Sequence, residues 1–140
     1  MARLLTDADS LRKLLRDART IAVVGASPKP ERPSHGVMAF LQSVGYRTIP
    51  VNPGIAGGTL LSERVYASLT EIPDRIDLVD VFRRAEETPE VARAAVAIKA
   101  KAIWLQLGIA NDEAARIAIG GGLDVVMDRC TAIEIRRLGI

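Results

Sequence analysis

The sequence predicts an α/β fold: a single doubly wound, Rossmann-like domain with a five-stranded, mainly parallel sheet. Five short apolar runs alternate along the 140 residues with segments whose apolar residues recur at helical spacing. Continuous apolar runs are typical of strands that are buried on both faces, as in parallel sheets covered by helices. The length fits one domain, since domains usually hold about 100–200 residues.

The five predicted strands are short, and the first four are followed by turn-forming or polar residues. They cover Thr20–Val24, Tyr46–Val51, Asp77–Phe82, Ala102–Leu107 and Asp124–Met127. The first ends at Gly25 and the second at Asn52-Pro53-Gly54, both of which favour a turn. Right-handed crossovers between parallel strands give 3-2-1-4-5 as the simplest strand order.

Helices are predicted between these strands and at both ends of the chain. Residues 1–19 form an N-terminal helix that packs on the domain, which spans 1–140, because Leu11, Leu14 and Leu15 make one apolar stripe. Ser34 is expected to cap the helix that runs through Val44. Further helices are expected to begin at Thr88, Asn111 and Thr131.

Composition excludes several classes of protein. The formal net charge is only +2 and aromatic residues make up 4% of the chain, so we expect no nucleic-acid partner. The single cysteine, Cys130, forms no intramolecular disulfide, and with the single histidine, His35, it makes no metal site. No run of 18 apolar residues and no signal peptide is present, so we expect no membrane partner and a cytoplasmic location.

The loop after the first strand carries the strongest functional signal. In doubly wound sheets, ligands bind beyond the carboxyl ends of the strands, at the switch point beside the first strand. Gly25 allows a sharp turn there, and the helix that starts near Ser34 and His35 offers unpaired N–H groups to a phosphate. Lys29 and Arg32 add positive charge. The alternative is that Gly25 only provides the turn that every such fold needs.

The usual dinucleotide and ATP signatures are missing from this loop. Of the three glycines in the G-x-G-x-x-G fingerprint only Gly25 is present, since Ser27 and Pro30 occupy the other positions. No acidic residue stands after the second strand, where Asn52-Pro53 is found, and no Gly-Lys-Ser/Thr follows the first strand. The architecture is therefore that of a nucleotide-binding domain that lacks the NAD and ATP motifs.

Six segments, in this order and spacing, carry a family resemblance that covers nearly the whole chain. They are Val23–Ser27, Ser34–Met38, Tyr46–Pro53, Val79–Arg84, Trp104–Gly108 and Met127–Cys130. With them, the chain resembles the small stand-alone CoA-binding proteins. These look like the N-terminal CoA-binding domain of the succinyl-CoA synthetase α subunit.

The resemblance implies that coenzyme A, or acyl-CoA, lies across the switch point. The ADP part would lie over Gly25–Ser27 and over Val51–Pro53, and Phe82 and Arg83 would flank the ligand. Gln106 and Gly108 would border the path of the pantetheine arm. CoA carries phosphates, and the cations nearest to them in the sequence are Lys29, Arg32 and Arg83. The candidate binding residues are Gly25, Ala26, Ser27, Lys29, Arg32, Ser34, His35, Val51, Asn52, Pro53, Phe82, Arg83, Gln106 and Gly108.

The function expected first is non-catalytic binding of CoA or acyl-CoA, as a sensor, a carrier or a partner-dependent module. The related synthetases use additional domains for nucleotide binding and for a phosphorylated histidine, so the resemblance supports CoA binding rather than ligase activity. The alternative is a small oxidoreductase or acyl-CoA-handling enzyme that uses a nucleotide cofactor. A third interpretation is a subunit that acts with a separately encoded ATP-binding chain. Whether the chain forms a homodimer or binds an unidentified protein partner is left open.

Two further residues are singled out by their neighbours in the sequence. Asp80 lies inside an apolar run and is expected to be a buried, hydrogen-bonded structural residue. Cys130 follows Arg129 and precedes a predicted helix, and both features favour the thiolate. Because CoA ends in a thiol, Cys130 could form a mixed disulfide with it. The alternative for Cys130 is a small buried side chain.

Overall fold

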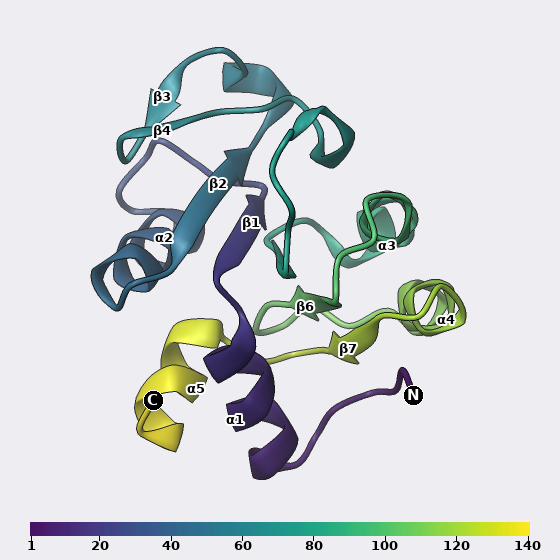
Figure 1. Cartoon of the computed structure of the whole chain (residues 1–140). Helices are drawn as coiled ribbons and strands as arrows, with labels where there is room; N and C mark the ends of the chain where they lie inside the picture. The colour runs from purple at the N-terminus through teal and green to yellow at the C-terminus, as the bar shows by residue number, and fades with distance from the viewer.

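A five-stranded parallel sheet lies between two layers of helices in the computed structural model, which describes all residues 1–140 (Figure 1). Its strands are β1 Thr20–Val24, β2 Arg47–Val51, β5 Leu78–Val81, β6 Ala102–Leu105 and β7 Asp124–Val126. They are ordered β2-β1-β5-β6-β7, and every neighbouring pair is parallel. The predicted fold class, a doubly wound Rossmann-like sheet, is confirmed.

The position of the third predicted strand needs a correction. Counted along the chain, the sheet strands are ordered 2-1-3-4-5 rather than 3-2-1-4-5, because β5 pairs with β1 and not with β2. On its outer edge, the carboxyl end of β2 pairs with Tyr66 instead. Tyr66 N–H donates to Pro50 O at 3.0 Å, and Asn52 N–H donates to Tyr66 O at 2.9 Å. The strand order still reverses beside β1, so the expected location of the site is unchanged.

The segment that covers the edge of β2 contains a small hairpin. Its antiparallel strands are β3 Thr59–Leu60 and β4 Glu63–Arg64. Three short 3-10 helices lie in the connections, η1 Pro53–Ile55, η2 Leu69–Glu71 and η3 Ala85–Glu87. Figure 1 shows the hairpin beyond β2, at the opposite end of the sheet from β7.

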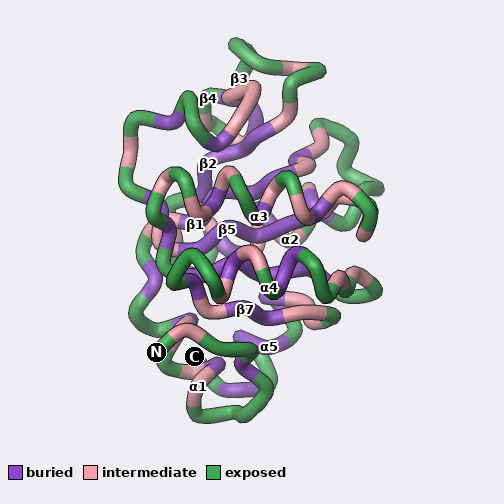
Figure 2. The backbone as a smooth tube through the Cα atoms, turned by 90° about the vertical axis from the view of Figure 1, so that its right-hand side faces the viewer, coloured by how far each residue is buried: buried purple, intermediate pink, exposed green.

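The helices divide between the two faces of the sheet. The first layer consists of α1 Ala8–Asp17, α2 Pro33–Ser43 and α5 Thr131–Leu138, and the second of α3 Thr88–Ala97 and α4 Asp112–Gly120. Strand residues alternate between them: Ile21 and Val23 face the first layer, and Ala22 and Val24 face the second. In Figure 2 the strands are buried, and the helices expose only their outer sides. None of the helices has the length and hydrophobicity to cross a bilayer.

The N-terminal helix is packed against the sheet through the side chains that the sequence singled out. Leu11 and Leu15 are fully buried in the first layer, and Leu14 packs against the same core. The cap of α1 is Asp7, whose carboxylate accepts from Ser10 N–H at 3.0 Å. Burying two leucines contributes roughly 3–6 kcal/mol, so this helix is a firm part of the domain.

The expected cap of α2 is wrong. The helix begins at Pro33, and the flanking residue is Arg32, whose side chain caps no N–H group. Proline has a suitable φ for the first helical position and has no N–H to satisfy. Ser34 is buried inside the first turn. The first turn of α2 is therefore left without a side-chain cap.

Gly25 lets three strand ends meet. Its φ is +87°, and a β-carbon there would lie 2.6 Å from the carbonyl oxygen of Phe82. Gly25 N–H donates to Val51 O at 3.0 Å, and Phe82 N–H donates to Val24 O at 2.8 Å. Only glycine has both the backbone conformation and the space that this contact requires.

We predict opposite effects for two glycine-to-alanine substitutions. Gly25→Ala should lower the free energy of unfolding by about 1–3 kcal/mol, because it adds strain and a backbone clash. Gly36 lies inside α2, and a β-carbon there would meet no atom within 4 Å. Gly36→Ala should therefore raise stability by about 0.5–1 kcal/mol. Urea denaturation measures both; equal stability of the two variants would contradict the assigned role of Gly25.

Candidate functional site

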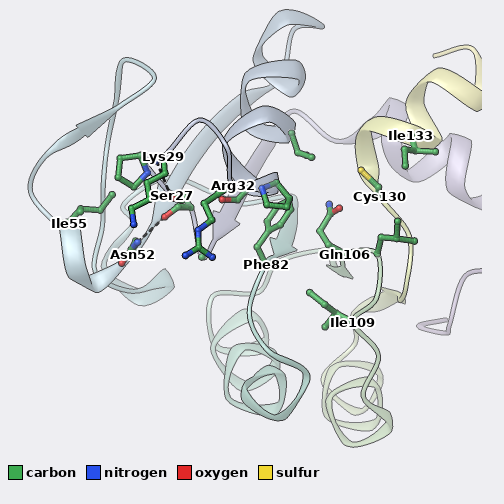
Figure 3. Close-up of a pocket in the computed structure, with 17 residues that line it drawn as sticks. Ser27, Lys29, Arg32, Asn52, Ile55, Phe82, Gln106, Ile109, Cys130 and Ile133 are labelled. Atoms are coloured by element: carbon green, nitrogen blue, oxygen red, sulfur yellow. Dashed lines mark hydrogen bonds between the residues drawn. The ribbon is translucent and has the colours of Figure 1, made fainter.

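A cleft of about 720 Å³ lies at the carboxyl ends of the central strands (Figure 3). The loop between β1 and α2 and the first turns of α2 form one wall, and residues after β6 and β7 form the other. Of the predicted binding residues, the cleft brings together Gly25, Ala26, Ser27, Lys29, Arg32, Ser34, Asn52, Phe82 and Gln106. The loop after the first strand is thus the main contributor, as the sequence predicted.

The remaining predicted residues lie outside this cleft. Val51, Pro53 and Arg83 line a second cavity of about 450 Å³ on the α3 side of the sheet. His35 is half-buried and Gly108 is exposed, and neither residue lines either cavity. The Arg83 guanidinium forms an ion pair with Glu87. Whether these five residues bind a ligand stays a prediction.

One end of the cleft is positively charged. The side chains of Lys29 and Arg32 are exposed, and neither forms an ion pair. The uncapped start of α2 adds its partial positive charge. No carboxylate lines the cleft. This end therefore suits an anion, and a phosphate above all.

Asn52 fixes the loop at this end. Its Nδ2 donates to Ala26 O at 2.8 Å, and its Oδ1 accepts from Gly54 N–H at 2.8 Å. Ser27 Oγ accepts from Lys29 N–H at 3.1 Å, which tightens the first turn of the loop. The backbone that would face a phosphate is held by hydrogen bonds from within the protein.

The other end of the cleft is apolar and holds the thiol. Figure 3 shows Cys130 and Ile133 at the opposite end from Lys29 and Asn52. Leu107 is 63% exposed and Ile133 is 49% exposed, so this end of the cleft presents apolar side chains to solvent. Sequence reasoning missed the lining residues Pro28, Pro33, Val37, Ile55, Leu107, Ile109 and Ile133. Ile55 and Ile109, two branched apolar residues in predicted loops, were the available signal.

The wall at this end is tied together by Asp128. Its φ is +57°, its Oδ1 accepts from Gly108 N–H at 2.6 Å, and its own N–H donates to Ile109 O at 3.0 Å. Trp104, in β6, adds a hydrogen bond from its Nε1 to Arg129 O at 2.7 Å. The loops after β6 and β7 are therefore joined, and the N–H of Gly108 is occupied within the protein.

A buried polar network lies beneath the cleft. Asp80 is fully buried; its Oδ1 accepts from Gln106 Nε2 at 2.5 Å, and its Oδ2 accepts from Thr131 Oγ1 at 3.2 Å. Gln106 Nε2 also donates to Thr131 Oγ1, at 3.0 Å. Burial raises the pKa of Asp80 to about 7, against the two hydrogen bonds, which lower it. The prediction of a buried, hydrogen-bonded Asp80 is confirmed.

A doubly wound sheet with a cleft at its switch point defines the Rossmann-like class of ligand-binding domains. Within that class, residues 19–136 match the family described as "CoA binding domain". The chain belongs to this family, so the resemblance seen in the sequence is confirmed.

The chain is also similar to individual known proteins. The chain is 40% identical over 123 residues to the uncharacterized protein YneT of Bacillus subtilis, covering 88% of this chain and 90% of YneT. A hypothetical protein from Pyrococcus horikoshii has a similar structure, with a TM-score of 0.92 and 38% identity, covering 96% of this chain and 94% of that one. The α subunit of ADP-forming acetate–CoA ligase I from Pyrococcus furiosus is 35% identical over 83 residues, which are 55% of this chain and 18% of that subunit.

We predict that the effect of Asp80→Asn on stability becomes more favourable as the pH rises. The pKa of Asp80 is raised from 3.8 to about 7 on folding, so the native state holds its proton more tightly than the unfolded chain does. The stability that this proton provides is complete below about pH 4 and is lost as the pH rises through about 7. The unfolding free energy of Asp80→Asn minus that of the wild type should therefore be larger at about pH 8 than at about pH 5.

Asp77→Asn is the matched control. Although desolvation raises the pKa of Asp77, the N–H groups of Arg19 and Thr20, at 2.8 and 3.0 Å, hold that pKa below 3.8 overall. Asp77 is thus ionised in both states between about pH 5 and pH 8, and its stability difference should be constant there. Denaturant unfolding at both pH values measures the two differences. If the difference in unfolding free energy between Asp80→Asn and the wild type is the same at both pH values, the pKa of Asp80 is not raised in the folded protein.

Proposed function

We propose that the protein binds coenzyme A or acyl-CoA in this cleft without catalysing a reaction itself, as a sensor, a carrier or a partner-dependent module. The observation that carries the proposal is that the cleft is positively charged at one end and apolar at the other. Lys29 and Arg32 stand at one end, and Leu107, Cys130 and Ile133 stand at the other. CoA has the same polarity, with phosphates at one end and a thiol at the other. Membership of the CoA-binding family supports the same ligand.

In this proposal the phosphates lie over Gly25–Ser27, beside Lys29 and Arg32 and at the start of α2. Arg83 stays a predicted phosphate ligand, but a phosphate would have to compete for it with Glu87. We propose binding without catalysis because the cleft lining includes neither a carboxylate nor the single histidine, His35. No nucleophile there is paired with a base. The alternative, a nucleotide-dependent oxidoreductase or acyl-CoA-handling enzyme, is an outcome of the first test.

That test is calorimetric titration of the protein with CoA, 3′-dephospho-CoA, NAD and ATP. We expect selective binding of CoA, with weaker binding of 3′-dephospho-CoA because one charged group is lost. Turnover assays with acyl-CoA, run alongside, should show no product. Preference for NAD, or no binding of CoA, would overturn the proposal.

Removing the unpaired cations should weaken the binding of CoA. We expect Lys29→Ala and Arg32→Ala each to lower the affinity roughly three- to tenfold, since each would remove a partly screened interaction with phosphate. Added salt should weaken binding to the wild type more than to the double variant. Arg116→Ala is the control, because Arg116 is an exposed residue of α4 that forms no ion pair and lines neither cavity. Equal affinities in all variants would remove the phosphate assignment.

Cys130 offers a test of the orientation of the ligand. If the CoA thiol reaches the apolar end, incubation with CoA disulfide should produce a protein–CoA mixed disulfide. The Cys130 thiolate attacks one sulfur of the CoA disulfide, and the second CoA leaves as its thiolate. Intact-mass spectrometry detects the adduct, and Cys130→Ser should show none. An unmodified wild-type protein would argue against this orientation.

A further inference from the structure

We propose that Gln106 is a fixed hydrogen-bond acceptor for a secondary amide N–H in the middle of the ligand, and that Asp80 and Thr131 are the positioning residues that hold it. This inference rests on the proposed function, because the only such amides in CoA are those of its pantetheine arm. The sequence predicts only that Gln106 borders the path of that arm; the inference adds the hydrogen bond that it accepts and the residues that orient it.

The first observation is that the nitrogen of the Gln106 amide is fully used inside the protein. Nε2 donates to Asp80 Oδ1 at 2.5 Å and to Thr131 Oγ1 at 3.0 Å. An amide nitrogen has two hydrogens, so neither is left for a ligand.

The chemistry of the network fixes which way the amide faces. Above a pH of about 7, where Asp80 is ionised, its carboxylate accepts hydrogen bonds and donates none, so the NH₂ end of Gln106 faces Asp80. The hydroxyl of Thr131 gives its hydrogen to Asp80 Oδ2 at 3.2 Å, which leaves its oxygen to accept from Gln106. Each member of the network thus determines the orientation of the next.

The remaining oxygen, Oε1, is the group available to a ligand. It accepts from no donor in the protein. Because no fully buried side-chain polar atom of the protein lacks a partner, this oxygen must be partly accessible. Gln106 is only 3% exposed, and it lines the cleft. Its small accessible part is therefore at the cleft, where it presents an acceptor that water or a ligand must satisfy.

The position of Gln106 identifies the ligand group. Figure 3 shows Gln106 between Phe82 and Cys130, and Lys29 and Arg32 lie on the far side of Phe82. The acceptor is thus located between the phosphate end and the thiol end. CoA carries its two amides, each with one N–H, between its phosphates and its thiol. An amide N–H is the complement of the free oxygen of Gln106.

The test compares two ligands, CoA and 3′-phospho-ADP, which lacks the pantetheine arm. The ratio of their affinities isolates the contribution of the arm. Gln106→Met keeps the length of the side chain and removes the acceptor, so we expect it to lower the affinity for CoA roughly five- to tenfold. Its affinity for 3′-phospho-ADP should stay within about twofold of that of the wild type. Unchanged binding of 3′-phospho-ADP also shows that the variant is folded.

Thr131→Val tests the positioning role, because it removes one partner of the amide and leaves the accepting oxygen in place. We expect a loss of about two- to fivefold, again in the binding of CoA alone. Thr88→Val is the matched control. Thr88 is a buried first residue of α3, as Thr131 is of α5, and its hydroxyl donates to Ala85 O at 2.7 Å. Thr88→Val should leave the ratio of affinities unchanged.

The wild-type protein provides a measurement that needs no variant. CoA should shift the ¹³C resonance of the Gln106 side-chain carbonyl, and 3′-phospho-ADP should not. No such shift, or variants that change both affinities equally or neither, would overturn the role of Gln106. Failure of the wild type to bind CoA would instead overturn the proposed function, and this inference with it.

Discussion

The contact between Gly25 and the backbone of Phe82 is the constraint on which the site depends. A β-carbon on Gly25 would lie 2.6 Å from Phe82 O, so the ends of β1 and β5 approach this closely only because residue 25 is glycine. The hydrogen bond from Gly25 N–H to Val51 O, at 3.0 Å, brings in the end of β2. The loop toward α2, the start of that helix and the floor of the cleft all take their positions from this point. The position of the cleft wall between β1 and α2 thus depends on one backbone contact.

The two cavities beside this point differ in charge. The larger one has Lys29 and Arg32 and no carboxylate, whereas the smaller one is lined by Glu86, Glu87 and Glu90 around Arg83. Phe82 belongs to the first and Arg83 to the second, so neighbouring residues separate them. A polyanionic ligand is attracted to one side and repelled from the other. The charge of the protein is nearly balanced overall, yet its distribution at this edge of the sheet makes the larger cavity the more favourable one for an anion.

The sequence was most informative where a local pattern determines the structure. The five apolar runs predicted the strands, and Gly25 indicated the loop that contributes most of the cleft. The strand order could not be read in the same way, because the segment beside β2 has strands of only two residues and pairs with β2 through a single bridge at Tyr66. The predicted cap at Ser34 failed because Pro33 begins the helix one residue earlier.

The apolar end of the cleft was harder to predict for a different reason. Ile55, Ile109 and Ile133 come from three separate segments, and no motif relates them. Their convergence is a result of tertiary packing. The partners of Asp80 pose the same difficulty, since Gln106 and Thr131 lie 26 and 51 residues away along the chain. Burial of an aspartate indicates that donors must be present, but it does not identify them.

The hydrogen bonds that Asp128 forms with Gly108 and Ile109 have a consequence for the rate at which a ligand enters and leaves. With the loops after β6 and β7 joined through Gly108 and Ile109, that wall has little freedom to open. The opposite loop carries Pro28, Pro30 and Pro33, which limit its conformations before any ligand arrives. A cleft that is preformed on both sides loses little conformational entropy on binding. Differences in affinity among related ligands should then arise mainly from residence time, while encounter rates stay similar.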